Sequence, residues 1–284
     1  MLRRLFTFFS FTAIFLPSLA KADNVTVALV VPKAGSYQQQ GAELTKGVQQ
    51  AVDEINNAGG LLGKKLKLLA IDDQCNDSIA VSTAQMLTIL KQKNIKLIIG
   101  PYCANSFEEI TDIYAKGQLF QIIPTTVNYT QAKTIKKGLV KMLGYTNQQA
   151  KDFFDYYNSN MAVFVNKYTA GGEFLEYMDG LAEGVYFMAL RGKEEDPEFA
   201  ETLVKLRLNG FDADGLSLYG YSAVNLWKSL VTAAKSFDYN KVSNQAAKGV
   251  KTEFGSQMFH NGAPSTSESY AIYRYEDGNM NKVY

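Results

Sequence analysis

The sequence predicts an α/β fold whose N-terminal part is a doubly wound parallel sheet. Two observations carry this prediction. Four short apolar runs, typical of buried strands, alternate along the chain with three stretches of helical periodicity. The loops between them are short, as is usual when each strand is followed by a helix that packs back on the sheet. A chain of 284 residues, 46% of them hydrophobic, is long and apolar enough for one large or two modest domains.

The four predicted strands are nearly continuous apolar runs without internal prolines. Such runs are typical of strands that are buried on both faces of a parallel sheet. The first is followed by Pro32 and the fourth by Pro124, which ends each run. The predicted strands comprise residues 24–31, 66–71, 95–99 and 119–123.

Three predicted helices connect these strands. The first ends before the pair Gly59–Gly60, since glycine commonly terminates helices. Its apolar side chains recur close to the helical period and are Leu44, Val48, Ala51, Val52 and Ile55. The predicted helices comprise residues 41–57, 78–92 and 106–115.

The pattern is less regular after Gly144. Alternating residues 270–275 precede the turn sequence Glu276-Asp277-Gly278, which predicts a terminal strand or hairpin. Further helices are predicted at 147–157, 173–181, 198–208 and 220–236, and further strands at 161–165 and 184–189.

Two cysteines, Cys75 and Cys103, are the only ones in the chain, and each follows a predicted strand. The two strands and the helix between them form a βαβ unit, whose parallel strands end at the same edge of the sheet. A disulfide between the two cysteines is therefore feasible, with two free thiols as the alternative. Open α/β sheets bind ligands at this carboxyl edge, so the cysteines are expected beside a binding crevice.

The N-terminus has the parts of a secretory signal peptide. Arg3 and Arg4 precede the apolar run 5–16, and Ala20-Lys21-Ala22 is a small-x-small cleavage pattern. We expect cleavage after Ala22 and export to an oxidising compartment, which permits the disulfide. A retained membrane anchor is the alternative, although the apolar run is too short to span a bilayer.

The composition argues against several classes of function. Removal of residues 1–22 takes away Arg3, Arg4 and Lys21, so the net charge changes from +1 to −2 and 262 residues remain. Such a balance does not favour nucleic-acid binding. With one histidine, His260, and no second cysteine pair, neither a metal site nor a redox pair is expected. Asp72-Asp73 is interpreted as a strand-end turn rather than as a metal or acid–base pair.

Four segments with a characteristic order follow the predicted strands: the loop with Tyr37, residues 71–75 (Ile-Asp-Asp-Gln-Cys), residues 98–103 (Ile-Ile-Gly-Pro-Tyr-Cys) and residues 122–126 (Ile-Ile-Pro-Thr-Thr). With the signal peptide, they resemble the first lobe of the type I periplasmic substrate-binding proteins of ABC transporters. The resemblance is greatest to the leucine/isoleucine/valine-binding branch. It covers residues 25–144 and resumes in short segments from Leu181 onward.

The resemblance implies two Rossmann-like lobes that close on a small amino acid without covalent chemistry or a cofactor. It implies that loops after the third and fourth strands hold the ligand's carboxylate, where a helix N-terminus and free N–H groups provide partial positive charge. The alternative to a ligand-binding role for Tyr37 is that it is an ordinary aromatic residue of its loop. The alternative for Tyr168 is that it packs within the reduced second lobe. The candidate ligand-binding residues are Tyr37, Tyr102, Ala104, Asn105, Thr125, Thr126, Val127 and Tyr168.

Two positions depart from the family pattern. Ala104 stands where the family usually has a serine that binds the carboxylate, and Val127 stands where a threonine is usual. Loss of two hydroxyls that meet a charged group costs roughly 1.5–3 kcal/mol each. Backbone N–H groups remain, and Asn105, Ser106 or Thr126 are possible substitutes.

The second lobe is expected to be much reduced. Fewer than forty residues separate Gly144 from Leu181, where the family has most of this lobe. The acid that usually pairs with the ligand's ammonium has no clear counterpart, with Glu173 and Asp179 as candidates. The expected division is a signal peptide (1–22), a first lobe (23–143 plus 185–250) and a reduced second lobe (144–184 plus 251–284).

The favoured hypothesis is a periplasmic solute-binding protein that delivers a branched-chain type of amino acid to an ABC permease in the inner membrane. The alternative is a degenerate remnant with little ligand affinity that acts as a sensor or protein-contact module. An α/β enzyme is the weakest hypothesis, because neither a nucleophile–base pair nor a cofactor fingerprint is recognisable.

Overall fold

The protein is described here by a computed structural model. The described residues are 24–90, 94–103, 106–124, 136–142, 186–190, 197–211, 215–252, 255–257, 259–260, 263–264, 270–277 and 279–282.

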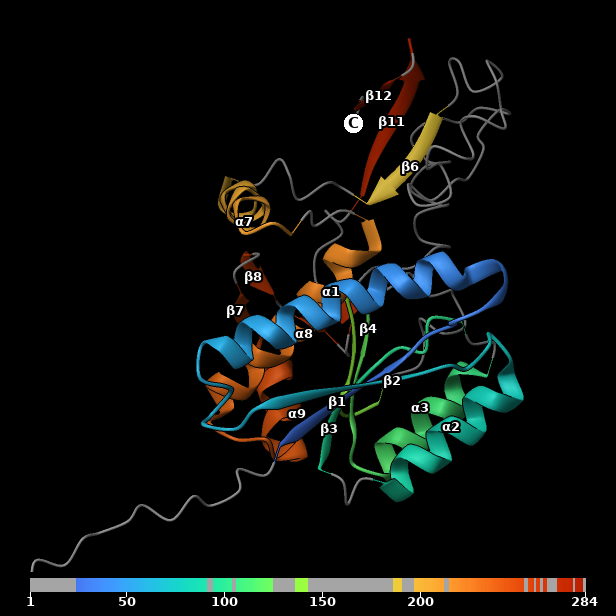
Figure 1. The fold of residues 1–284 in the computed structure, drawn as a ribbon, viewed down its shortest axis with the longest axis vertical. Coiled ribbons are helices and arrows are strands. Elements are labelled where there is room, and N and C mark those ends of the chain that lie inside the picture. Colours follow the sequence, from blue (N-terminus) through green and yellow to red (C-terminus); the bar gives the residue numbers. More distant parts are fainter. Residues whose placement is uncertain are drawn as a thin grey trace, which may run out of the picture.

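A five-stranded parallel sheet forms the centre of the fold (Figure 1). Its strands are β1 (Val25–Val30), β2 (Leu66–Ile71), β3 (Ile95–Ile99), β4 (Phe120–Ile123) and β5 (Leu139–Lys141). They lie in the order β2-β1-β3-β4-β5, and each neighbouring pair is parallel. The four predicted strands are confirmed to within a residue at either end. The fifth, β5, was not predicted, because three residues are too few to show a pattern.

Helices cover both faces of this sheet (Figure 1). They are α1 (Gln38–Asn57) and α8 (Gly215–Ala234) on one face, and α2 (Asp77–Ile89) and α3 (Phe107–Lys116) on the other. Strand β1 shows the division, since Val27 and Leu29 pack in the cluster with α1 and α8 while Ala28 and Val30 pack in the cluster with α2 and α3. The predicted doubly wound arrangement is confirmed.

Helices α1 and α8 approach closely at two glycines. A Cβ atom on Gly47 would lie 1.8 Å from the backbone oxygen of Ser217, and one on Gly220 would lie 2.5 Å from that of Leu44. Glycine at both positions therefore lets the two backbones meet. The Tyr221 hydroxyl also donates a hydrogen bond of 2.6 Å to Glu54 Oε2. These contacts bring a late part of the chain back onto the N-terminal sheet.

A short helix not predicted from the sequence, α9 (Tyr239–Lys248), follows α8. Its N-cap residue Asp238 accepts a hydrogen bond of 3.0 Å from the N–H of Lys241. The Tyr239 hydroxyl donates to the Lys137 backbone oxygen, beside Gly138, whose φ is +78°. The helix therefore packs against the start of β5 and covers that edge of the sheet.

The remaining described elements lie in the C-terminal half. Strand β11 (Tyr270–Glu276) pairs antiparallel with β12 (Asn279–Lys282) and with β6 (Tyr186–Leu190). The predicted terminal hairpin is confirmed, and it belongs to a three-stranded sheet that lies apart from the central one (Figure 1). The other elements are the 3-10 turn η1 (Gly35–Tyr37), α7 (Pro197–Leu208), β7 (Val250–Thr252), β8 (Gly255–Gln257), β9 (Phe259–His260) and β10 (Ala263–Pro264).

Three predicted elements, at residues 147–157, 161–165 and 173–181, lie outside the described residues. Among the helices that the structure describes, none has the length and apolar character needed to cross a membrane.

Candidate functional site

The disulfide lies at the carboxyl edge of the parallel sheet. The sulfur atoms of Cys75 and Cys103 are bonded and their Cα atoms are 5.0 Å apart, within the usual range for a disulfide. Cys75 lies in the loop after β2 and Cys103 in the loop after β3. The predicted bond is thus confirmed, and it holds two loops of the expected crevice together.

Asp72 connects two further loops at this edge. Its Oδ1 accepts hydrogen bonds from the N–H of Lys33, at 3.0 Å, and from the N–H of Gln74, at 2.9 Å. Lys33 belongs to the loop after β1 and Gln74 to the loop after β2, so one carboxylate fixes both. Asp73 Oδ1 accepts from the N–H of Cys75 at 3.3 Å. Both aspartates therefore serve the strand-end turn, and no group of metal-ligating side chains occurs among the described residues.

Asp73 is also fully buried, which is unusual for a carboxyl group. Burial raises the pKa of Asp73 above its usual range, against the lowering effect of its hydrogen bond from Cys75. Its Oδ2 and the Tyr114 hydroxyl have no hydrogen-bond partner among the described residues. Burial raises the pKa of Tyr114 too, and the charge of Asp73 adds to that effect. The two buried groups therefore interact electrostatically.

The loop after β3 is held against the sheet by its backbone. Gly100 has a φ of +97°, and a Cβ atom there would lie 2.5 Å from the Val30 oxygen. The same Val30 oxygen accepts a hydrogen bond of 3.2 Å from the N–H of Tyr102. Gln121 Nε2 donates to the Gly100 oxygen at 3.0 Å. These bonds fix the position of Tyr102 in the loop after β3.

Tyr37 and Tyr102, two of the predicted site residues, come together at this edge. Their ring centroids are 6.0 Å apart with an angle of 55° between the planes, a tilted arrangement that aromatic pairs prefer. Tyr37 is 48% exposed, whereas Tyr102 packs against the core cluster. Burial raises the pKa of Tyr102 to about 12, and Tyr37 and Glu43 contribute smaller effects.

The N-terminus of α3 begins close to the disulfide. Its first helical residue is Phe107, four positions after Cys103, and its N-cap residue is Ser106. The N–H of Ser106 donates a hydrogen bond of 3.4 Å to Asp77 Oδ1 at the start of α2. The Ser106 side chain does not cap the helix. A helix N-terminus at the carboxyl edge is suited to an anionic group such as a carboxylate.

The other predicted site residues, Ala104, Asn105, Thr125, Thr126, Val127 and Tyr168, lie outside the described residues. Glu173 and Asp179, the candidate partners for an ammonium group, do so as well. Their roles remain predictions.

Two charged residues at this edge were missed by sequence reasoning. Lys141 ends β5 opposite Ile123, is fully buried, and has a pKa lowered to about 8 by burial. Glu43 of α1 lies close enough to Tyr102 to affect its titration. Lys141 was missed because its strand was not predicted. Glu43 was missed because a glutamate on an amphipathic helix normally faces solvent.

The doubly wound sheet with its braced carboxyl edge defines a Rossmann-like α/β protein, a class that binds ligands outside the carboxyl ends of its strands. A sequence profile of the periplasmic binding protein family matches residues 24–183, more than half of the chain. The chain belongs to this family.

Similar proteins agree with this assignment. The Leu/Ile/Val-binding protein of Escherichia coli is 27% identical over 208 residues, which are 69% of this chain and 54% of that protein. An amino acid binding protein of Pseudomonas aeruginosa is 27% identical over 198 residues, 66% of this chain and 52% of that protein. The expected resemblance to the leucine/isoleucine/valine-binding branch is thereby confirmed.

A leucine-binding protein from Thermotoga maritima of known structure has the same fold, with a TM-score of 0.71 and 14% identity over 92% of this chain and 98% of that one. The expected type I periplasmic-binding-protein fold is confirmed. The chain spans about half the length of the curated relatives it matches, in agreement with the expected shortening.

Proposed function

We propose that this protein is an exported solute-binding protein of an ABC importer and that it binds a small amphipathic amino acid of the branched-chain type. The observation that carries the proposal is the carboxyl edge of the sheet. There the Cys75–Cys103 bond holds two loops beside the Tyr37–Tyr102 pair and close to the N-terminus of α3. Relatives of the same family are named as Leu/Ile/Val-binding proteins.

The chemistry of this edge suits such a ligand. The carboxylate of an amino acid would lie at the N-terminus of α3, where N–H groups and the helix dipole favour negative charge. An aliphatic side chain would pack against the rings of Tyr37 and Tyr102. Backbone N–H groups of Ala104 and Val127 would replace the two missing hydroxyls. The remaining proposed contacts are Asn105, Thr125, Thr126 and Tyr168.

We assign residues 23–143 and 185–250 to the first lobe, and 144–184 and 251–284 to the reduced second lobe. The return of α8 and α9 to the five-stranded sheet supports the first assignment. Strand β6, however, pairs with β11 in the sheet that lies apart from the central one, which favours placing residues 186–190 with the second lobe.

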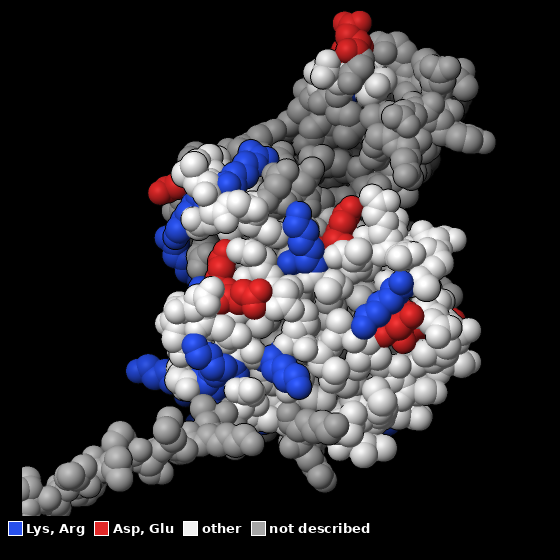
Figure 2. Space-filling view, in the orientation of Figure 1, with Lys and Arg blue, Asp and Glu red and all other residues white. Residues whose placement is uncertain are grey.

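Residues 1–22 are proposed to direct export to the periplasm, where the chain would deliver its ligand to a permease in the inner membrane. Family membership supports this location. On the face drawn in Figure 2, described lysine, arginine, aspartate and glutamate side chains are interspersed, so that face favours no polyanionic partner such as a nucleic acid. The family and its relatives are binding proteins, which favours a role without catalysis.

The second candidate is a remnant with little ligand affinity that acts as a sensor or protein-contact module. The missing hydroxyls at Ala104 and Val127 and the fewer than forty residues between Gly144 and Leu181 favour it. A site that is not closed by a second lobe buries less of its ligand than the roughly 70–90% that is usual.

A thermal-shift screen of the oxidised protein with all common amino acids separates the two candidates. At a ligand concentration about 100 times Kd, binding stabilises the native state by about 2.7 kcal/mol. That raises the Tm by about 5–10 °C in a chain of this size. A shift with leucine, isoleucine or valine supports the importer role, and no shift with any amino acid supports the remnant.

A further inference from the structure

Glu43 is a half-buried carboxylate in the second turn of α1, the helix that begins just after the loop following β1. Its charge contributes to the raised pKa of Tyr102, after the larger effect of burial. Glu43 also lies on the helix that directly follows Tyr37, whose ring contacts that of Tyr102. Within the part of the chain that the structure describes, no lysine, arginine or histidine forms an ion pair with Glu43. A carboxylate that is partly removed from water is stabilised by a cationic partner, and Glu43 is open to one supplied by a ligand.

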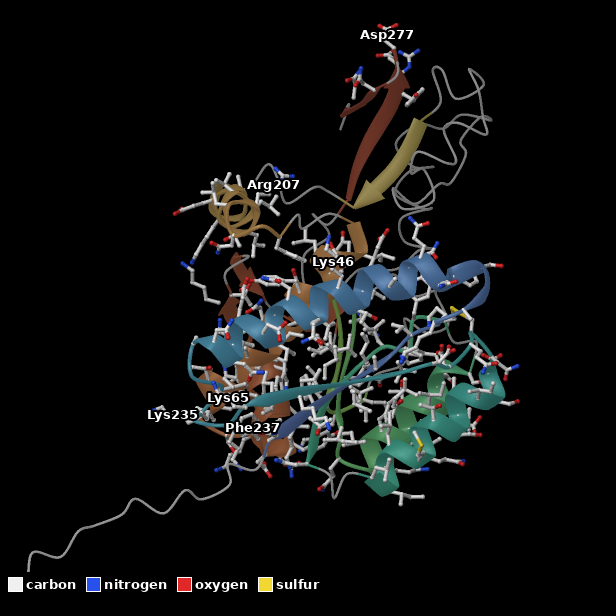
Figure 3. All side chains as sticks on the ribbon, in the orientation of Figure 1. Lys46, Lys65, Arg207, Lys235, Phe237 and Asp277 are labelled. Atoms are coloured by element: carbon white, nitrogen blue, oxygen red, sulfur yellow. A yellow bond between two sulfur atoms is a disulfide. The ribbon has the colours of Figure 1, made fainter. Side chains whose placement is uncertain are left out.

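The nearest cation along the helix is directed elsewhere. Lys46 follows Glu43 by three residues on α1, a spacing that permits an ion pair. Its Nζ instead lies 5.5 Å from the centre of the Phe211 ring. Figure 3 shows Lys46 on α1, in the part of the molecule between α7 and the central sheet. Lys46, the only lysine or arginine on α1, thus makes a cation–π contact with Phe211 and does not pair with Glu43.

A second acceptor lies one turn before Glu43. Gln40 Oε1 is buried and has no hydrogen-bond partner among the described residues. Residues three apart on a helix share a face, so Gln40 and Glu43 project to the same side of α1. Buried amide oxygens are normally hydrogen-bonded, so Gln40 Oε1 is able to accept a hydrogen bond from a ligand donor.

Two aromatic rings complete the surroundings. Tyr37 directly precedes α1 and its ring lies 6.0 Å from that of Tyr102. The face of a tyrosine ring attracts an ammonium group within about 6 Å. A carboxylate, an unpartnered amide oxygen and two phenol rings therefore gather at one corner of the sheet edge. All of them favour a positively charged hydrogen-bond donor.

We propose that Glu43, together with Gln40, Tyr37 and Tyr102, binds the ammonium group of the amino-acid ligand. The inference rests on the proposed amino-acid-binding function and deepens it. The ligand would lie across the edge with its carboxylate toward α3 and its ammonium toward α1. Both charged ends of the ligand would then be held by the first lobe, so a reduced second lobe would not need to supply the acid.

The test compares leucine with two probes, each of which lacks one of leucine's two charged groups. Leucine has both groups, 4-methylpentanoate lacks the ammonium, and 3-methylbutylamine lacks the carboxylate. Each is titrated calorimetrically into the oxidised wild-type protein, Glu43→Gln and a control, Asp53→Asn, which removes an exposed carboxylate from the same helix. Thermal melts establish that all three proteins are folded.

We expect Glu43→Gln to weaken the binding of leucine and of 3-methylbutylamine by about ten- to a hundredfold, the usual effect of losing a hydrogen bond between charged groups. Binding of 4-methylpentanoate is expected to stay the same, and Asp53→Asn is expected to bind all three probes like the wild type.

The outcomes separate this inference from the proposed function. If leucine binds the wild type and Glu43→Gln changes its Kd by less than about twofold, the assignment of Glu43 is wrong while the function stands. If only 3-methylbutylamine binds, and Glu43→Gln abolishes it, the ammonium site stands while amino-acid binding does not. If the folded wild type binds none of the probes, both are overturned.

Discussion

Because α1 and α8 are in close contact, we predict that replacing Gly47 by alanine destabilises the protein, although the same change in an open helix is stabilising. Replacement of glycine by alanine in an open helix stabilises it by about 1 kcal/mol. At Gly47, however, the new Cβ atom would lie 1.8 Å from the Ser217 backbone oxygen, whereas ordinary contacts begin at 3.4 Å. Because the obstacle is backbone, a change of side-chain rotamer cannot relieve it.

The magnitude follows from two opposing effects. Overpacking of a well-packed core typically costs about 1–3 kcal/mol, and the rigid neighbour places Gly47→Ala near the upper end. The gain in helix propensity offsets about 1 kcal/mol of this. We therefore expect a net loss of about 2 kcal/mol in the free energy of unfolding. With a urea m-value of about 3 kcal/mol/M, the unfolding midpoint falls by about 0.7 M.

Urea unfolding followed by circular dichroism measures this shift. Ala42→Gly is the control, because Ala42 is exposed on the same helix and reports helix propensity alone. The control is expected to lose about 1 kcal/mol. An unchanged or raised midpoint for Gly47→Ala would refute the close contact between the helices and, with it, the return of α8 to the N-terminal sheet.

Two further predictions concern the carboxyl edge. Removal of the disulfide in a Cys75→Ser/Cys103→Ser variant is expected to lower the free energy of unfolding by about 3–4 kcal/mol, as the 28-residue separation implies; a variant as stable as the oxidised wild type in urea would contradict this. Burial raises the pKa of Asp73 in the folded protein. The protonated carboxyl group therefore contributes its full stabilisation below the pKa of the unfolded state, near 3.8, and this stabilisation is lost as pH rises through the higher pKa of the folded state. Asp73→Asn, which keeps an oxygen for the Cys75 N–H, is therefore expected to raise the Tm at pH 7 more than at pH 3.5. An equal change at both pH values would show that the buried carboxyl group is not the cause.

The central sheet could be predicted because its strands are buried on both faces. Residues 95–99, for example, have four apolar side chains out of five, and the observed strand has the same bounds. Topology made the disulfide feasible, since a βαβ unit brings the ends of its two strands together, and the predicted export to an oxidising compartment permitted it. Neither prediction needed a long-range contact to be known in advance.

The elements that were missed depend on tertiary contacts. Helix α9 is ten residues long, is mostly polar, and buries only Val242, Ser243 and Ala246, so the sequence offers few apolar residues to mark it. Its position depends on Tyr239 and the backbone of Lys137, about a hundred residues earlier. Likewise, Gly47 and Gly220 carry no local signal, because their role exists only where the two helices cross.

The candidate site was predictable only in part for the same reason. Tyr37 was identified from its loop, whereas its contact with Tyr102 was not predicted and is seen only in the structure. Glu43 and Gln40 look like solvent-facing positions of an amphipathic helix in the sequence. Only the structure shows that Gln40 Oε1 is buried without a hydrogen-bond partner and that the charge of Glu43 affects Tyr102.

Calorimetric titration of the oxidised protein with leucine, isoleucine and valine tests the proposed function most directly. The proposal predicts saturable one-to-one binding with a Kd on the order of micromolar, equivalent to about −8 kcal/mol, for at least one of the three. Absence of heat with all three, from protein shown to be folded and disulfide-bonded, would contradict a role in branched-chain amino-acid uptake and leave the remnant as the better explanation.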